Sequence, residues 1–319
     1  MLRATPSVLS SSFKTRANLP LASEPSSTDP LDLVRLAPLM KLTSGRAEVA
    51  IGLIDGPVAT GHVDLTSANI REIPGTLGGV CTRADSVACL HGTFVAGILC
   101  ANRDSVAPAI CPKCTLLVRP IFAEGSEANT QMPSSTPEEL ATAIVDCIDA
   151  GASVINLSAA LAQPSSKGER RLEQSLDYSA KRGVIVVAAA GNQGTVGSSA
   201  ITRHPWVIPV IACDLRRRPL EYSNLGNSIG RRGLSAPGVG ITSLVVNGNQ
   251  SPGFGGTSAA APFVTGAIAL LWSEFPGVPA AKMRMVLAQG GHRATVVPPL
   301  LDAWAAYQTM MAQASKKIS

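Results

Sequence analysis

Apolar residues in this chain form short continuous runs that alternate with longer segments of helical periodicity. The continuous runs favour buried parallel strands, and the periodic segments favour helices that cover a sheet. The expected strands are 48–54, 115–121, 153–158, 183–189, 206–212 and 241–246. The expected helices are 91–101, 137–150, 168–182, 258–274, 279–289 and 299–313. Strands that alternate with helices predict an α/β fold in three layers, with a doubly wound, mostly parallel sheet.

The composition fits one large globular domain. With 319 residues, 45% of them hydrophobic, the chain can bury a sizeable core. Residues 1–30 are rich in Ser, Pro and Thr and predict a flexible tail, residues 31–313 form the domain, and 314–319 form a basic tail. No apolar run of seven residues follows the early basic residues, and no region of pro-domain size precedes the domain. We therefore expect a cytoplasmic protein, with a transit peptide as the alternative.

Charge and hydropathy exclude two classes of partner. The longest apolar run, 259–272, is too short to span a bilayer, so no membrane segment is expected. The net charge of +5 comes partly from the runs 216–218, 231–232 and 316–317. Such runs are typical of solvated surfaces, although they can also attract an acidic peptide. With 4% aromatic residues and no stacking motif, nucleic-acid binding has no support.

One serine lies between a flexible turn and a segment that favours helix. Gly255 and Gly256 permit a strained entry turn, three alanines follow Ser258, and Pro262 is expected within the first helical turn. A serine in this position is often only an N-cap. It is also placed where free backbone N–H groups stabilise developing negative charge, as a nucleophile requires.

A nucleophilic serine needs a base and a carboxylate that orients the base. His91 opens the small-residue helix expected at 91–101, whereas the other three histidines start no regular element. Asp55 ends the apolar strand expected at 48–54, at the strand end where open α/β sheets place their sites. The strand expected at 183–189 leads into the Gly-Asn-Gln-Gly run at 191–194, and the amide of Asn192 is a donor suited to an oxyanion hole.

Together these segments resemble the subtilisin-like serine proteases, the subtilase family. The resemblance covers residues 45–290 and the order Asp55, His91, Asn192, Ser258. It implies that this chain is a serine endopeptidase without a cofactor, acting through a catalytic Asp55–His91–Ser258 triad. The oxyanion hole would comprise Asn192 and the backbone N–H of Ser258. No carboxylate-rich loop resembles the calcium sites of the family.

The same resemblance implies a cleft for an extended polypeptide, bound by strand addition. One side would be formed by Leu157, Ser158, Ala159 and Ala160, and the other by Ala189, Ala190 and Gly191. Small side chains at the first side leave room for a substrate residue without identifying it.

Two departures from the common family pattern refine the resemblance. Asp55 is followed by Gly-Pro-Val, and Phe94 stands where a second histidine is frequent. The Asp-Gly-Pro-Val variant is similar to proteases that mature ribosomally made peptides, notably the cyanobactin proteases. It implies removal of a leader segment from a precursor, with a modifying enzyme as a further partner. The alternatives are a transpeptidase or macrocyclase, disfavoured because only 36 positions separate Asp55 from His91, and a non-catalytic peptide-binding module.

Seven cysteines leave their pairing open. The Cys111-Pro-Lys-Cys114 motif is compatible with zinc or a redox pair, but a zinc site would need two further ligands at matching spacing. Structural thiols with local disulfides, Cys81–Cys89 or Cys111–Cys114, are favoured. We predict no metal site.

Overall fold

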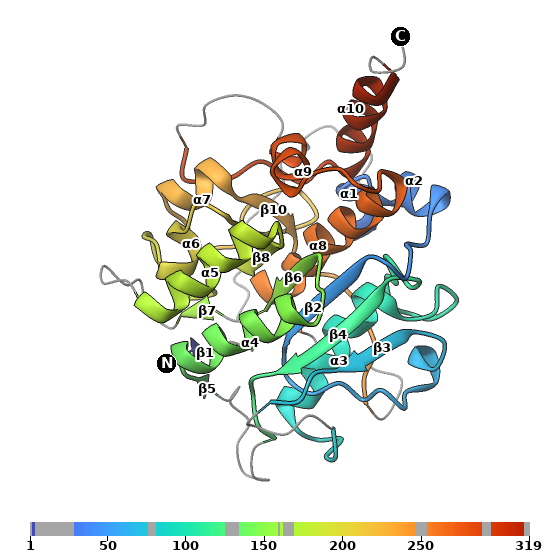
Figure 1. The fold of residues 1–319 in the computed structure, drawn as a ribbon, viewed down its shortest axis with the longest axis vertical. Coiled ribbons are helices and arrows are strands. Elements are labelled where there is room, and N and C mark those ends of the chain that lie inside the picture. The colour runs from blue at the N-terminus through green and yellow to red at the C-terminus, as the bar shows by residue number, and fades with distance from the viewer. Residues whose placement is uncertain are drawn as a thin grey trace, which may run out of the picture.

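A parallel sheet of seven strands organises the chain (Figure 1). The computed structural model describes residues 2–3, 29–75, 81–124, 134–158, 160–161, 169–246, 254–288 and 295–315. The strands of this sheet are β2 (Ala50–Asp55), β3 (Asn69–Glu72), β4 (Thr115–Pro120), β6 (Val154–Leu157), β8 (Ile185–Ala189), β9 (Val207–Cys213) and β10 (Leu234–Pro237). They lie in the order β10-β9-β8-β6-β2-β4-β3.

The strand order reverses between β2 and β6. From β2 the chain passes to the edge strand β3 and returns to β4, which lies between β3 and β2; it then crosses to β6 and continues outward through β8, β9 and β10 on the other side. Every pair in this sheet is parallel. All carboxyl ends therefore meet at one edge, and the reversal creates the crevice in which open α/β sheets bind ligands. The predicted doubly wound fold is confirmed.

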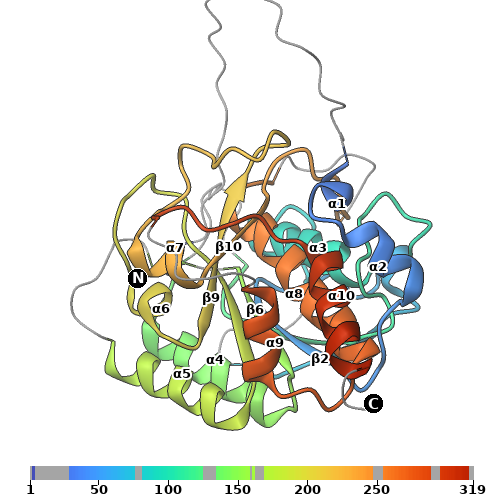
Figure 2. The same cartoon turned by 90° about the horizontal axis from the view of Figure 1, so that it is seen from above.

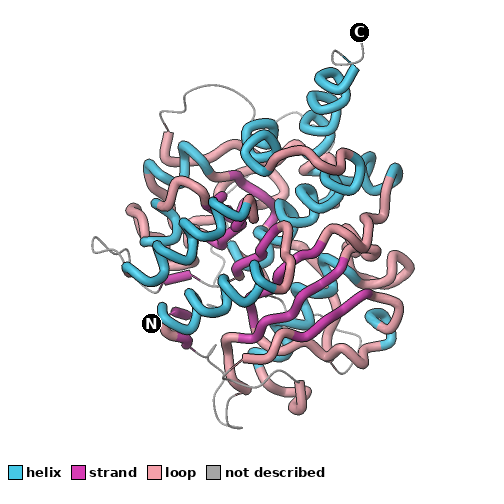
Figure 3. Tube along the Cα trace, viewed as in Figure 1, coloured by secondary structure: helices cyan, strands magenta, loops and turns pink. Residues whose placement is uncertain are grey.

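Helices cover both faces of the sheet, which gives the three predicted layers (Figures 2 and 3). On one face lie α3 (Val87–Cys100) and α8 (Thr257–Glu274), and on the other α4 (Pro137–Asp149) and α5 (Arg170–Arg182). The remaining helices are α1 (Pro30–Leu33), α2 (Leu36–Leu42), η1 (Val63–Leu65), α6 (Ala200–Arg203), α7 (Asn227–Arg232), α9 (Ala280–Leu287) and α10 (Ala303–Ser315). Within the described residues, no helix combines the length and apolarity that a bilayer crossing requires.

Helices bury both faces of the sheet. Nearly every residue of α8 is buried, so the all-round apolar run that predicts it packs in the interior rather than on the surface. Opposite it, α4 and α5 bury one face each against the sheet. Asp55 and the amino ends of α3 and α8 are thus held by rigid, well-packed elements.

Three short strands form a separate antiparallel sheet beside the main one. They are β1 (Leu2–Arg3), β5 (Ser134–Ser135) and β7 (Ala160–Leu161), in the order β5-β1-β7. The predicted tail over 1–30 did not anticipate that residues 2–3 pair with two other segments, or that α1 begins at Pro30. Residues 4–28 lie outside the described part of the chain.

Several predicted boundaries were wrong for identifiable reasons. Residues 241–246 form no strand, because the parallel partner of β9 is 234–237 and 241–246 pack as a buried loop. Helix α3 begins at Val87 rather than at His91, since the apolar residues before His91 continue the helical turn. Helix α10 begins at Ala303 because Asp302 accepts a hydrogen bond from the N–H of Ala305, which caps the helix there. It ends at Ser315, within the predicted basic tail.

Candidate active site

Asp55 lies at the crevice where the strand order reverses. It is the last residue of β2 and has no solvent exposure. Its Oδ1 accepts a hydrogen bond from the N–H of Gly56 at 2.7 Å. A Cβ at Gly56 would lie 2.0 Å from the carbonyl oxygen of Ala88, so glycine is needed for α3 to approach this closely. The Asp-Gly pair thus brings the carboxylate and the start of α3 together.

His91 joins the carboxylate to the serine. Its Nδ1 lies 2.7 Å from Asp55 Oδ1, and its Nε2 lies 3.0 Å from Ser258 Oγ. The His91 side chain is 4% exposed and comes from the second turn of α3. The next position, Gly92, requires glycine, because a Cβ there would lie 2.4 Å from the carbonyl oxygen of Pro57. The three side chains that the sequence predicts as a triad therefore form one hydrogen-bonded chain.

Ser258 is the second residue of α8, after Gly256 at φ +81°. Pro262 lies in the second helical turn, not in the first as expected. Proline has no N–H to donate to the carbonyl four residues earlier, which is that of Ser258. The hydroxyl of Ser158, beyond the end of β6, lies 3.5 Å from that oxygen and approaches it in place of the missing donor.

Asn192 is oriented by the residue next to the serine. Its Oδ1 accepts hydrogen bonds from both the backbone N–H and the hydroxyl of Thr257, each at 3.0 Å. Because these two bonds fix the amide oxygen, they also fix the direction of the amide NH₂ group. Asn224 holds the same loop, since it donates to Ala190 O at 3.1 Å and accepts from the N–H of Gln193 at 3.1 Å.

Sequence reasoning missed Phe254, which packs on the imidazole. The Phe254 and His91 rings meet edge to face at 5.2 Å, and Phe254 meets Phe94 in the same manner at 5.5 Å. Phe94 is fully buried. Phe94, which departs from the common family pattern, therefore supports the His91 side of α3 through a second aromatic ring. The only sequence signal for Phe254 is an aromatic residue just before the Gly-Gly turn.

The residues predicted to line the substrate cleft lie in several different environments. The Leu157 side chain is fully buried in the core, and Ser158, at 2% exposure, contacts the Ser258 carbonyl. Ala189, Ala190 and Gly191 are buried near Asn192, where Val210 and Asn224 already bond the Ala190 backbone. Ala160 belongs to β7, and Ala159 lies outside the described residues. Their contact with substrate stays a prediction.

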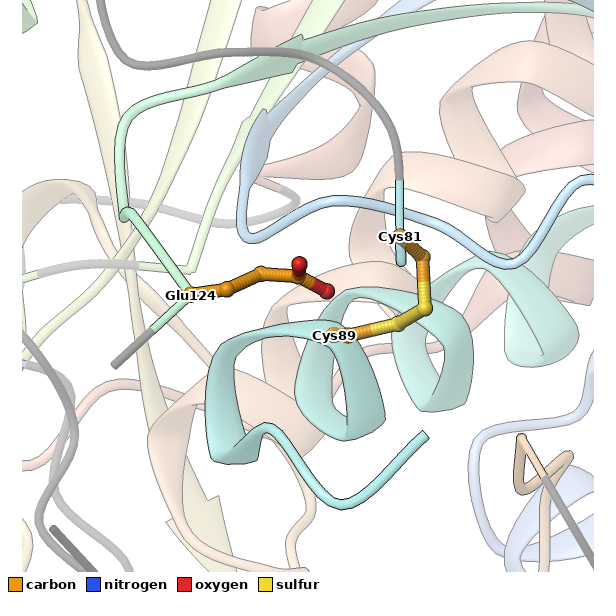
Figure 4. Close-up of side chains that lie close together, drawn as sticks. All are labelled: Cys81, Cys89 and Glu124. Atoms are coloured by element: carbon orange, nitrogen blue, oxygen red, sulfur yellow. A yellow bond between two sulfur atoms is a disulfide. The ribbon is translucent and has the colours of Figure 1, made fainter. Parts of the chain in front are cut away.

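A disulfide joins Cys81 to Cys89 at the amino end of α3, two residues before His91 (Figure 4). One of the two pairings left open by the sequence is thus confirmed. Glu124 lies beside the bridge and accepts from the N–H groups of Thr82 and Arg83, each at 2.9 Å. The two sulfurs are bonded to each other, so this cluster does not offer the thiolates that a metal ion would require.

Reduction of this disulfide is expected to lower the free energy of unfolding by about 2–3 kcal/mol, because it releases a short loop in the unfolded chain. Urea unfolding with and without dithiothreitol measures the loss. A Cys81→Ser variant should already carry the loss and should not respond to reductant. Equal stability of reduced and oxidised wild-type protein would contradict the prediction.

The other cysteines are buried and free, so the Cys111–Cys114 disulfide is not formed. Burial raises the pKa of the Cys100 thiol to about 12, which leaves it protonated and unreactive at neutral pH. A hydrogen bond from Cys111 lowers the pKa of Cys114. Among the remaining histidines, His62 caps η1 and His204 lies 3.3 Å from Asp177, whereas His292 is outside the described residues.

Comparison with known proteins places this chain in a family. The sequence profile of the subtilase family matches residues 46–294. Subtilisin DY of Bacillus licheniformis is 30% identical over 243 residues, which cover 75% of this chain and 81% of the relative. Subtilisin E of Bacillus subtilis (strain 168) is 29% identical over 249 residues, but the match spans only 59% of that relative.

Solved structures share the fold. A mutant of the protease domain of PatA superposes with a TM-score of 0.76 at 28% identity, covering 84% of this chain and 97% of that one. The prenylagaramide maturation protease PagA gives 0.73 at 26% identity, covering 86% and 98%. The PatG macrocyclase in complex with peptide gives 0.78, covering 92% and 100%, but at 20% identity it shows the fold alone.

Proposed function

The chain belongs to the subtilase family of serine endopeptidases, and on that premise we propose that Asp55, His91 and Ser258 hydrolyse a peptide bond in a precursor, removing its leader segment. The proposal is carried by one observation. A single imidazole lies 2.7 Å from a buried carboxylate and 3.0 Å from a serine hydroxyl at a helix amino end.

The hydrolysis follows from the roles of the two imidazole nitrogens. With Nδ1 donating to Asp55, Nε2 accepts the Ser258 proton as Oγ attacks the scissile carbonyl carbon. The imidazolium that forms is stabilised by the carboxylate and returns the proton to the leaving amine. A water then attacks the acyl-enzyme with the same base, which releases the carboxylic acid and restores the serine.

The negative charge of the tetrahedral intermediate needs donors in place. Within the described residues, the N–H of Ser258 has no acceptor, whereas those of its neighbours in the first turn bond Asn192 and Gly256. A free N–H at the amino end of α8 favours an oxyanion both as a donor and through the helix dipole. The oriented amide of Asn192 supplies the second donor.

Leader removal is supported by the similarity of this chain to maturation proteases, and not by the geometry of Asp55, His91 and Ser258. PatA and PagA are 26–28% identical to this chain over most of its length, and PagA is named as a maturation protease. The polypeptide substrate, and a modifying enzyme that presents it, belong to the same proposal. Hydrolysis is favoured over macrocyclisation because 56–75 and 81–90 contain only η1, β3 and the first turn of α3. No capping domain occurs in those described residues.

A leader-removing protease is expected to cut few sites. We expect the chain to cleave a mixed peptide library in one narrow sequence context and to leave denatured casein largely intact over the same time, with subtilisin E as the digestive control. Mass spectrometry of the products measures both. Casein fragmentation at many sites, at a rate near that of the control, would contradict leader removal but not proteolysis.

The cytoplasmic location stays a prediction. The Cys81–Cys89 disulfide argues against it, because disulfides persist mainly in oxidising compartments. The alternative of a non-catalytic binding module is tested by the Ser258 variant described in the Discussion.

A further inference from the structure

Three arginines line one pocket at the edge of the sheet opposite the catalytic crevice. This arginine pocket has a volume of about 230 Å³ and lies among α7, α9 and the amino ends of β9 and β10 (Figure 2). Arg231 and Arg232 come from α7, and Arg284 comes from α9. All strands are parallel and Asp55 ends β2, so the pocket is separate from the crevice that holds Ser258.

Two guanidinium groups of the pocket are held in place by neutral partners. Arg232 Nη2 donates to the carbonyl oxygens of the last two residues of α6, at 3.3 and 2.8 Å. Arg284 Nη2 donates to Pro205 O at 2.6 Å, and its Cζ lies 4.4 Å from the centre of the Trp206 ring. Because both side chains are already ordered, an anion that binds them bears little of the entropic cost of ordering them.

These contacts leave the positive charges uncompensated. Within the part of the chain that the structure describes, no carboxylate forms an ion pair with any arginine of the pocket, and Glu173 on the nearby α5 pairs with Arg203 instead. The Nε groups of Arg232 and Arg284 are buried donors without an acceptor there. Burial and the charge of Arg232 lower the pKa of Arg284 to about 10, which still leaves it positive at neutral pH. A bound anion would relieve this repulsion.

The apolar part of the pocket indicates which anion it suits. Ile208, Leu234 and Leu287 line it together with Met285, whose side chain is 65% exposed. A glutamate side chain matches this combination, since its methylene groups can contact the apolar wall while its carboxylate binds guanidinium groups. Free phosphate would place charged oxygens against apolar atoms that cannot bond them. The pocket therefore suits an acidic residue of a peptide better than an inorganic anion.

We propose that the arginine pocket binds a glutamate of the polypeptide substrate, in a segment outside the stretch that enters the crevice. The inference rests on the proposed proteolysis. Three strand spacings separate β10 from β6, and β10 is four residues long, so pocket and crevice are about 20 Å apart. About six to ten extended residues span that distance. Attachment at two points would favour precursors that carry both segments.

Direct binding tests the pocket without proteolysis. In the full chain carrying Ser258→Ala, we use fluorescence anisotropy with a rhodamine-labelled peptide in which glutamate alternates with alanine. It should bind about tenfold more tightly than its glutamine counterpart. Arg231→Glu places a carboxylate beside the other two arginines and should remove this preference. Arg216→Glu, an equal charge change at another exposed arginine, is the matched control and should keep it.

Three results of the binding experiment would overturn the inference. The first is equal affinity for the glutamate and glutamine peptides, and the second is an equal loss of preference in the two arginine variants. The third concerns the kind of anion. Inorganic phosphate should weaken binding no more than sodium chloride does at the same ionic strength. Selective displacement by phosphate would identify a site for an inorganic anion instead.

Kinetics then tests whether the bound segment belongs to the substrate. The two peptides are attached through a ten-residue glycine-serine linker to the amino end of a chromogenic peptide, because a leader precedes the scissile bond. The glutamate form should have a KM about tenfold lower than the glutamine form in wild type and in Arg216→Glu, but not in Arg231→Glu. Equal KM values in wild type would overturn the inference. If fluorophosphonate does not label Ser258 in wild type, the proposed proteolysis fails, whereas the anisotropy result still decides whether the pocket binds glutamate.

Discussion

Replacing Ser258 with alanine is expected to lower kcat for peptide hydrolysis by about 10⁶ and to abolish fluorophosphonate labelling. In the proposed mechanism, the Ser258 Oγ, which lies 3.0 Å from His91 Nε2, forms the acyl bond, so the variant would lack the nucleophile. Removing either the serine or the histidine of subtilisin has an effect of about this size. Single-turnover assays with a chromogenic peptide measure the loss.

The control for this variant is a measurement of its folding stability. Alanine keeps the helix and removes one oxygen, so urea unfolding should change by less than about 1 kcal/mol. His91→Ala should lose a similar factor, and the double variant should lose little more, because the two residues act as one unit. Wild type that folds but neither labels nor hydrolyses would favour a peptide-binding module.

The hydrogen-bonded arrangement of Asp55, His91 and Ser258 was predictable because each residue is marked by its own local sequence. Asp55 ends a continuous apolar strand, His91 lies in a small-residue helix, and Ser258 follows a Gly-Gly turn. Each signal depends on residues within one segment. The crevice then follows from the rule that parallel strands end at a common edge.

The supporting contacts were not predictable because they join segments distant in sequence. Phe254 is recognisable only once α3 and α8 are packed together, and the approach of Ser158 to the Ser258 carbonyl depends on a proline beyond the first helical turn. Strand β10 escaped prediction because Leu-Ser-Ala-Pro has little strand character of its own. It forms because β9 offers an open edge.

Arg119 is a second case, in the core, of contacts that the sequence does not predict. It lies in the buried strand β4 with 1% exposure, where a charge is unexpected. Its guanidinium donates to Asp146 at 2.8 Å and to Glu139 at 2.9 Å, both from α4. The sequence shows the charge but not its partners, since only the packing of α4 on the sheet brings them into reach.

Replacing Asn192 with alanine is expected to lower kcat by about 10²–10³ while KM changes little. The amide donor binds the oxygen strongly only after it acquires charge in the tetrahedral intermediate, so its loss weakens the transition state more than the ground state. Steady-state kinetics on a chromogenic peptide separate the two constants. Equal losses in kcat and in substrate affinity would contradict an oxyanion role.

Two further variants distinguish donation from positioning, because Asn192 also accepts two hydrogen bonds from Thr257. Asn192→Asp keeps an acceptor for Thr257 and removes the NH₂ donor, so it should be at least as impaired as the alanine variant. Thr257→Val removes one of the two bonds to the amide oxygen and leaves the donor in place, so its loss should stay within about tenfold. An aspartate variant with nearly wild-type kcat would show that Asn192 serves only to hold the start of α8, and the Ser258 N–H would then be the one oxyanion donor that the proposal retains.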